Sequence, residues 1–260
     1  LPVFHSTSED TNLFISAVNA LDTFIEMVHG DWVQSILFIE LASSPACHRL
    51  IGYDPTNLPA HLFNKIMKAF QDLHDKIISD HLAGYIMSQF VSHASVFAKS
   101  MHYGITREPV DQPIKLHPSF SKSVMALSEA MALVKSHKLL PHLERCLEAI
   151  LIGRLADYMF YKVILKNYFH QSGMAAFMQD FSWFIKQLST IFATSTSIQE
   201  HFSKSTEAIK LMSITRQQYE SLAMLIQMQD HLKILAALKQ LGLQHLDIKE
   251  AVELLKLLKF

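Results

Sequence analysis

The sequence predicts an all-α protein, and two observations indicate this class. Only 7 glycines and 8 prolines interrupt 260 residues, and between them the apolar residues recur at helical spacing. No segment shows the alternation of apolar and polar residues that is typical of a half-buried strand. The length is sufficient for one large domain or for two smaller bundles, with a sizeable buried core.

Residues 1–103 are expected to form an N-terminal helical bundle. Its first helix is expected to begin at a capping box that opens with Ser6 and to end at Gly30. A second helix is predicted over 31–43. After a loop broken by prolines, a long helical pattern extends over 60–103 without an interrupting proline.

Residues 104–118 contain three prolines and are expected to be a linker or loop. A C-terminal helical bundle over 119–260 follows. Its helices are predicted over 119–137, 141–170, 173–193, 197–212, 215–240 (with a possible split near Asp230) and 247–258. Gly242 is expected to stop a helix, with Leu243 making the usual hydrophobic contact, and Asp247 is expected to cap the last helix.

Charge and composition exclude several classes of partner. The chain has 23 basic and 24 acidic residues, a net charge of −1 and no basic stripe, so nucleic-acid binding is not expected. The uncharged run over 83–98 is too short and too polar for a membrane span. Two cysteines cannot build a disulfide framework and are typical of a reducing compartment. Because the chain begins at Leu1, we expect it to be a fragment of a longer protein.

Catalytic, cofactor and metal sites are not predicted. Among 15 histidines, His74 and His81 lie two helical turns apart, and His142 has no third ligand nearby in the sequence. No HExxH, GxSxG or GxGxxG pattern occurs, and Cys146 is expected to be a packed thiol inside a helix. An enzyme or metal protein stays open as a second class, because distant residues can assemble a site.

The last predicted helix leaves a third class of protein open, a module that lies on a membrane surface. Lys256 and Lys259 lie among leucines, an arrangement with which a helix can lie on a membrane. Acidic residues such as Glu253 balance this charge, which favours a helix packed into the core. The 12 methionines and 17 phenylalanines fit apolar packing, and some of them can also line a groove for a partner helix.

The stretch YKVILKNYFHQSGMAAFMQDF combines two apolar helical runs with a polar break. The first run is expected to stop at Asn167, and the chain to break at Gly173 in a backbone conformation closed to other residues. Asn167 is expected to hydrogen-bond free backbone groups at the helix end, and Phe169 to pack the turn into the core. Asp180 is expected to make a polar contact between helices or to be solvated. The turn is therefore interpreted as a joint.

This stretch resembles the C-terminal region of the RINT/TIP family of vesicle-tethering subunits. The resemblance rests on Ile164, Leu165, Asn167, Phe169, Gly173, Ala175, Ala176 and Asp180, and it extends over residues 120–260. The segments 155–165, 200–214 and 237–258 also look like parts of the family pattern. Met174 and the pair Phe177-Met178 depart from it, because the family tends to have a small residue and a Gln-Leu pair there.

The resemblance implies an elongated rod of antiparallel helical bundles. It also implies a non-enzymatic subunit, without cofactor or small-molecule substrate, of an endoplasmic-reticulum complex that captures COPI-coated vesicles from the Golgi. The implied partners are a SNARE N-terminal region and other tethering-complex subunits, with only indirect contact to the membrane. The implied location is cytoplasmic, peripheral on the endoplasmic reticulum membrane.

Two alternatives share this packing pattern without sharing its function. One is the cargo-binding tail of a class V myosin, and the other is a subunit of another helical-rod tether, the exocyst or a Golgi tethering complex. The sequence does not assign the residues that contact a partner.

Overall fold

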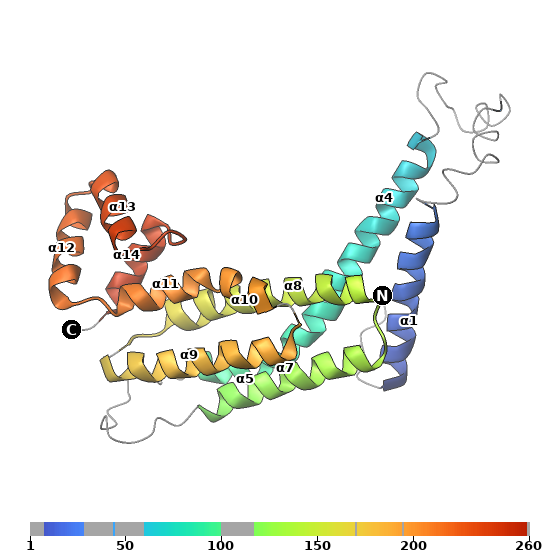
Figure 1. The fold of residues 1–260 in the computed structure, drawn as a ribbon, viewed down its shortest axis with the longest axis horizontal. Coiled ribbons are helices and arrows are strands. Elements are labelled where there is room, and N and C mark those ends of the chain that lie inside the picture. The colour runs from blue at the N-terminus through green and yellow to red at the C-terminus, as the bar shows by residue number, and fades with distance from the viewer. Residues whose placement is uncertain are drawn as a thin grey trace. The chain divides into compact units, whose positions relative to one another are not determined.

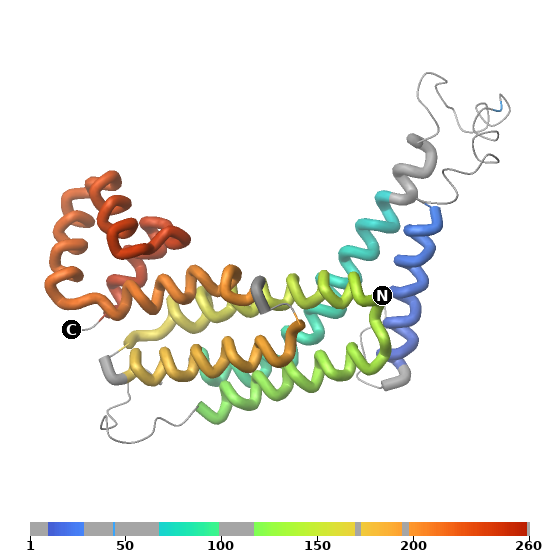
Figure 2. Tube along the Cα trace, viewed as in Figure 1, coloured from blue at the N-terminus to red at the C-terminus, as the bar shows by residue number. Residues whose placement is uncertain are grey.

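The computed structural model describes residues 8–28, 44, 60–99, 117–169, 171–193 and 195–258 (Figures 1 and 2). Every element in this part of the chain is helical, and its only bridge between extended residues joins Phe169 to Leu258. The all-α prediction is therefore confirmed. The chain divides into two compact units, Leu1–Tyr85 with Ala132–Leu147, and Ile86–Met131 with Glu148–Phe260. The division of the sequence at 104–118 stays a prediction.

The described part of the first unit is built on two helices that lie side by side (Figure 1). They are α1 (Ser8–Met27) and α4 (Ala60–Lys76), and α4 continues into the π-helical segment η2 (Ile77–Ala83). The unit also contains the end of α7 (Pro118–Ser136) and the start of α8 (Pro141–Tyr158).

Apolar packing and one amide hold these helices together. Ile25 and Val28 form a small core that is covered by Leu21 and Phe70. The amide of Asn19 on α1 donates to the carbonyl oxygen of Lys138 at 3.0 Å and accepts from the backbone N–H of Leu140 at 3.1 Å. One side chain thus satisfies two backbone groups of the turn between α7 and α8, where hydrogen bonds of the helices end.

The second unit contains most of the helices in the described residues. They are α5 (Gly84–Lys99), the larger parts of α7 and α8, the π-helical η3 (Met159–Val163), the 3-10 segment η4 (Ile164–Lys166), α9 (Gln171–Ile191), α10 (Ser195–His201), α11 (Ser203–Met212), α12 (Arg216–Gln227), α13 (His231–Gln240) and α14 (Ile248–Leu257). The predicted helix 197–212 is two helices that meet at Phe202, and 215–240 splits at Asp230, which caps α13 by accepting the N–H of Lys233 at 3.1 Å.

Phenylalanines form the centre of this unit. The fully buried ring of Phe184 on α9 lies 5.2 Å from the ring of Phe120, 6.0 Å from Phe90 and 5.8 Å from Phe202. Phe120 also stacks on Phe97 with the ring centroids 4.7 Å apart. Offset and edge-to-face contacts of this kind add to the free energy gained by burying the rings. The rings join α5, α7, α9 and the junction of α10 with α11.

The C-terminal helices end and begin as the local sequence predicts. Gly242 has a φ of +71°, and its N–H donates to the carbonyl oxygen of Lys239 at 2.9 Å. The N–H of Leu243 donates to the carbonyl oxygen of Leu238 at 3.0 Å. These two bonds form a Schellman motif. Asp247 and Glu250 form the capping box of α14. Buried Ala251, Leu254 and Leu255 pack α14 into the unit, as the core-packing interpretation predicts.

Several predicted features lie outside the described residues. They are the start of the capping box at Ser6, the second helix over 31–43, Cys47, and 104–116 of the proline-rich segment. Cys146 is described, and the prediction of a packed thiol is wrong for it. It lies inside α8, but its side chain is exposed.

Candidate functional site

The turn after α8 is the first candidate site. Helix α8 continues as the π-helical segment η3 and then as the 3-10 segment η4. It ends before Asn167, whose φ of −110° and ψ of 148° are those of an extended backbone. The next helix, α9, begins at Gln171. The break therefore precedes Gln171, and the prediction of a break at Ser172-Gly173 is wrong.

Asn167 ties the end of this helix to α5. Its Nδ2 donates to the carbonyl oxygen of Val163 at 2.7 Å and to that of Ala98 at 3.3 Å. The side chain is 1% exposed, and its Oδ1 is buried without a hydrogen-bond partner in the described structure. The predicted role, hydrogen bonding to free backbone groups at the helix end, matches this geometry.

Phe169 anchors the same turn in the core. The backbone of Phe169 pairs with that of Leu258 in the parallel bridge. The centroid of the Phe169 ring lies 5.3 Å from that of Phe177 on α9. The side chain is 2% exposed. The turn thus contacts α5, α9 and the end of α14, which is the geometry of a joint.

Gly173 and Asp180 lie on α9 and not in the turn. Gly173 is buried in the first turn of the helix, and among the described glycines only Gly242 has a positive φ, so the closed conformation predicted for Gly173 is not found. Asp180 is 2% exposed and has an interaction partner. Burial excludes the solvated alternative for Asp180.

Glu250 on α14 is the centre of a second polar group. Its Oε1 accepts the hydroxyl of Tyr161 at 3.1 Å and the ammonium of Lys204 at 3.0 Å, while its Oε2 accepts the N–H of Asp247 at 3.1 Å. Burial, and then the hydrogen bond to Glu250, raises the pKa of Tyr161. The hydrogen bond to Glu250 raises the pKa of Lys204. The hydroxyl of Tyr161, the ammonium of Lys204 and the side chain of Glu250 thus link η3, α11 and α14.

Glu207 on α11 holds the segment between α13 and α14. Its carboxylate accepts the backbone N–H groups of Gln244 and His245 at 2.8 Å each and that of Leu246 at 3.1 Å, and it lies 2.7 Å from Nδ1 of His245. Burial by itself raises the pKa of Glu207, but these backbone hydrogen bonds and His245 outweigh burial and hold the pKa below its ordinary value. The carboxylate is therefore ionised at neutral pH.

An open groove lies beside Glu207, between α9 and the helices α10 and α11. Its apolar wall comes mainly from Met178, Phe181, Ile185, Phe202 and Ile209, and its polar rim includes Glu207 and His245. The sequence allowed a groove lined by methionines and phenylalanines, but it indicated neither the position of this groove nor the role of Glu207. A single glutamate in an amphipathic helix has no local signature, because its partners lie 37 to 39 residues further along the chain.

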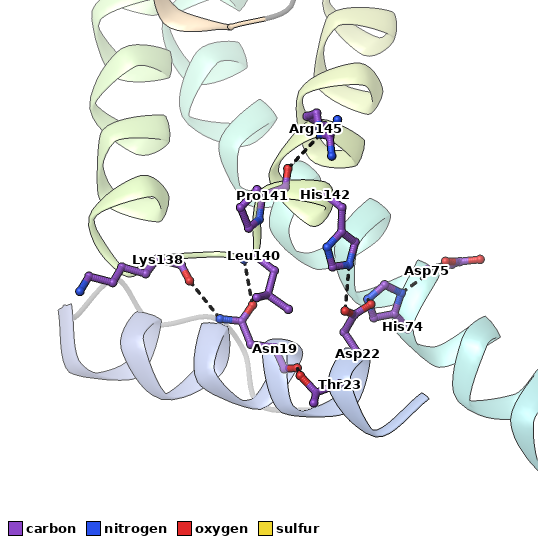
Figure 3. Close-up of polar contacts among 10 residues, drawn as sticks. All are labelled: Asn19, Asp22, Thr23, His74, Asp75, Lys138, Leu140, Pro141, His142 and Arg145. Atoms are coloured by element: carbon purple, nitrogen blue, oxygen red, sulfur yellow. Dashed lines mark hydrogen bonds and ion pairs between the residues drawn. The ribbon is translucent and has the colours of Figure 1, made fainter. Parts of the chain in front are cut away.

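A third polar group lies in the first unit, around Asp22 on α1 (Figure 3). Oδ1 of Asp22 lies 3.4 Å from Nε2 of His74 on α4, and Oδ2 lies 2.8 Å from Nε2 of His142 on α8. Glu26, one helical turn after Asp22, completes a group of possible metal ligands with Asp22 and His142. No further ligand lies near His142 in the sequence, but the fold brings Asp22 and Glu26 to it from a distant part of the chain.

The C-terminal helices expose large apolar side chains. Met224 on α12 and Met228, which follows the end of α12, are 65% and 67% exposed, and Leu232 and Leu235 on α13 are 80% and 40% exposed. Helices α12 and α13 contact each other, so these side chains belong to neighbouring elements (Figure 1). None of the described helices is both long and apolar enough to cross a membrane.

The fold and these sites define an all-helical protein whose buried polar side chains join helices to each other. The chain belongs to the RINT-1/TIP-1 family, whose sequence pattern matches residues 6–257. The match extends the resemblance seen over 120–260 to nearly the whole chain. Members of this family are subunits of tethering complexes, so the chain is a tethering-complex subunit in this general sense. Searches of curated proteins and of solved structures found no match.

Proposed function

We propose that this chain is a non-enzymatic part of an endoplasmic-reticulum tethering complex that acts in Golgi-to-ER retrograde transport. It binds the N-terminal region of a SNARE and other subunits of the tether, and it is cytoplasmic and peripheral on the membrane. The family match over residues 6–257 carries this proposal. It favours the retrograde tether over a class V myosin tail and over a subunit of the exocyst or a Golgi tether.

The surface of the C-terminal helices supports a role in protein binding. Exposed Met224, Met228 and Leu232 place flexible and branched apolar groups on adjacent helices. Scattered single apolar residues are normal on a surface, but contiguous ones are typical of interaction sites. Methionine adapts its shape to a partner at little cost, which suits a surface for helical segments.

Affinity purification of the tagged chain from its own cells, with identification of the bound proteins by mass spectrometry, tests the proposal. We expect enrichment of a SNARE of the endoplasmic reticulum together with tether subunits. Enrichment of myosin cargo adaptors or of exocyst subunits instead would contradict it. Binding of the purified chain to the recombinant N-terminal region of the recovered SNARE then separates direct from indirect contact, and a chain that binds only the tether subunits would remove SNARE binding from the proposal.

A further inference from the structure

We propose that Asp22, Glu26 and His142 form a binding site for a divalent transition-metal ion, for which Zn²⁺ fits the donor atoms best, with His74 beside Asp22. All of these residues belong to the first unit. Asp22 on α1, His74 on α4 and His142 on α8 are drawn in Figure 3, and Glu26 follows Asp22 on α1. Ligand atoms of Asp22, Glu26 and His142 all lie within 4.8 Å of one another. Ligands around a tetrahedral zinc are about 3.3 Å apart, so small side-chain rotations bring these atoms to ligand positions.

Two buried atoms of this group lack hydrogen-bond partners. Asp22 is 7% exposed, and its Oδ2 has no hydrogen bond in the described structure although Nε2 of His142 lies only 2.8 Å away. The two atoms are thus close but are not oriented as donor and acceptor. Nε2 of His74 is also buried and without a hydrogen bond, 3.4 Å from Oδ1 of Asp22. A buried carboxylate oxygen and a buried imidazole nitrogen that lack hydrogen bonds are both atoms that can accept a cation.

The negative charge of the buried Asp22 carboxylate also favours a bound cation. A buried carboxylate is costly unless a positive charge or hydrogen-bond donors compensate it. The ion pairs found for Asp22 in the described structure are with His74 and His142, and a histidine carries a charge only when it is protonated. A bound cation supplies that charge and a partner for Oδ2 of Asp22.

The donor types select the metal class. Imidazole nitrogens with carboxylate oxygens suit zinc and related transition metals, whereas magnesium and calcium prefer sites made only of oxygen. The second histidine, His74, is an outer neighbour of this group, with its Nε2 3.4 Å from Oδ1 of Asp22.

The ion would connect helices that are far apart in the sequence. Asp22 and Glu26 lie near the start of the chain, His74 follows the long segment after α1, and His142 opens α8. Because such a site forms only in the folded unit, binding of the ion stabilises that unit. The role we infer is therefore structural, and it is independent of the proposed transport function.

Calorimetric titration of the EDTA-treated 260-residue chain with ZnCl₂ at pH 7.5 tests the site. We expect one Zn²⁺ per chain and an increase in the melting temperature on addition of Zn²⁺, with no increase for Mg²⁺. His142→Gln and Glu26→Gln are expected to weaken Zn²⁺ binding by about 100-fold or more, beyond the roughly 10–100-fold loss typical of outer-shell changes. Both side chains reach solvent, so these variants are expected to fold.

Matched controls are His93→Gln on α5 and Glu129→Gln on α7, which change exposed residues of the same types and are expected to bind Zn²⁺ like the unmodified chain. Co²⁺ in place of Zn²⁺ is expected to give a visible absorption spectrum that His142→Gln removes. Absence of Zn²⁺ binding, or equal affinity in His142→Gln and the unmodified chain, would overturn the site. So would a melting temperature that depends on the protonation of histidine between pH 5 and 8 but not on Zn²⁺, because protonated histidines would then compensate Asp22.

Discussion

The carboxylate of Glu207 accepts the backbone N–H of Leu246 at 3.1 Å, although 39 residues separate the two in the chain. The same carboxylate accepts the N–H groups of Gln244 and His245. One side chain of α11 thus fixes the path of the chain from α13 into α14. Three backbone donors would lose their partner if this carboxylate were removed.

Glu207→Ala is expected to lower the free energy of unfolding by about 2–4 kcal/mol, because it leaves three N–H groups without their charged acceptor. Urea denaturation followed by circular dichroism measures the change. Glu220→Ala is the matched control: Glu220 pairs with Arg216 at 3.0 Å on an exposed surface of α12. Such pairs contribute about 0.5 kcal/mol or less. Equal losses in the two variants would contradict the role given to Glu207.

The ionisation of Glu207 is also expected to make the free energy of unfolding depend on pH. The folded pKa of Glu207 lies below the unfolded value, which is close to 4.5. The unfolded chain therefore binds a proton first as the pH falls, so the contribution of Glu207 is complete above the unfolded pKa and disappears as the pH falls through the folded pKa.

Denaturation curves of the unmodified chain and of Glu207→Gln, recorded from pH 7 to pH 3, test this sign. We expect a constant difference in unfolding free energy above about pH 6 and a difference that shrinks below about pH 4.5. A difference that grows toward low pH would show that the pKa of Glu207 is raised in the folded state.

Asn167→Ala is expected to destabilise the second unit by about 2 kcal/mol, because the carbonyls of Val163 and Ala98 lose a buried donor. Lys166→Ala changes the exposed neighbouring residue and is expected to alter the unfolding free energy by less than about 0.5 kcal/mol. Chemical denaturation measures both variants. A stability of Asn167→Ala equal to that of Lys166→Ala would show that the amide does not hold the turn.

Gly242→Ala and Gly84→Ala are expected to shift stability in opposite directions. Gly242 has a φ of +71°, so alanine there costs about 1 kcal/mol of backbone strain, while the nearby Nζ of Lys210 can move away. Gly84 lies in a helix with nothing within 4 Å of an added Cβ, so alanine is expected to stabilise by about 0.5–1 kcal/mol. Thermal denaturation compares the two, and a shift of the same sign in both would contradict this difference in backbone conformation.

The exposed apolar side chains of α12 and α13 are expected to matter for partner capture but not for folding. Replacing both Met228 and Leu232 by serine is expected to reduce recovery of the SNARE by about tenfold, because an interface loses apolar contacts worth about 1.4 kcal/mol. The melting temperature is expected to stay unchanged, since both side chains are mostly exposed. Met125→Ser, at a residue that is 58% exposed on α7, is the control and is expected to leave recovery unchanged. Equal recovery with the double variant would place the SNARE contact elsewhere.

Part of the site could be predicted from neighbouring residues. Asn167 was expected to bond backbone groups at a helix end, and one of its two acceptors, Val163, lies four residues away. The other acceptor, Ala98, is 69 residues away and could not be found. The prediction for Gly173, a backbone conformation closed to other residues, is wrong because the helix begins before it, at Gln171.

The sequence by itself determined the helical class, the Schellman motif at Gly242 and the capping box at Asp247, because spacing of apolar residues and caps depend on a few adjacent residues. Only the tertiary structure decided which polar groups are buried together. Glu207 with Leu246, Asn167 with Ala98, and Asp22 with His142 are pairs whose members are distant in the chain. Such pairs form because apolar packing brings the helices together, and a buried polar group must then find a partner wherever the fold supplies one.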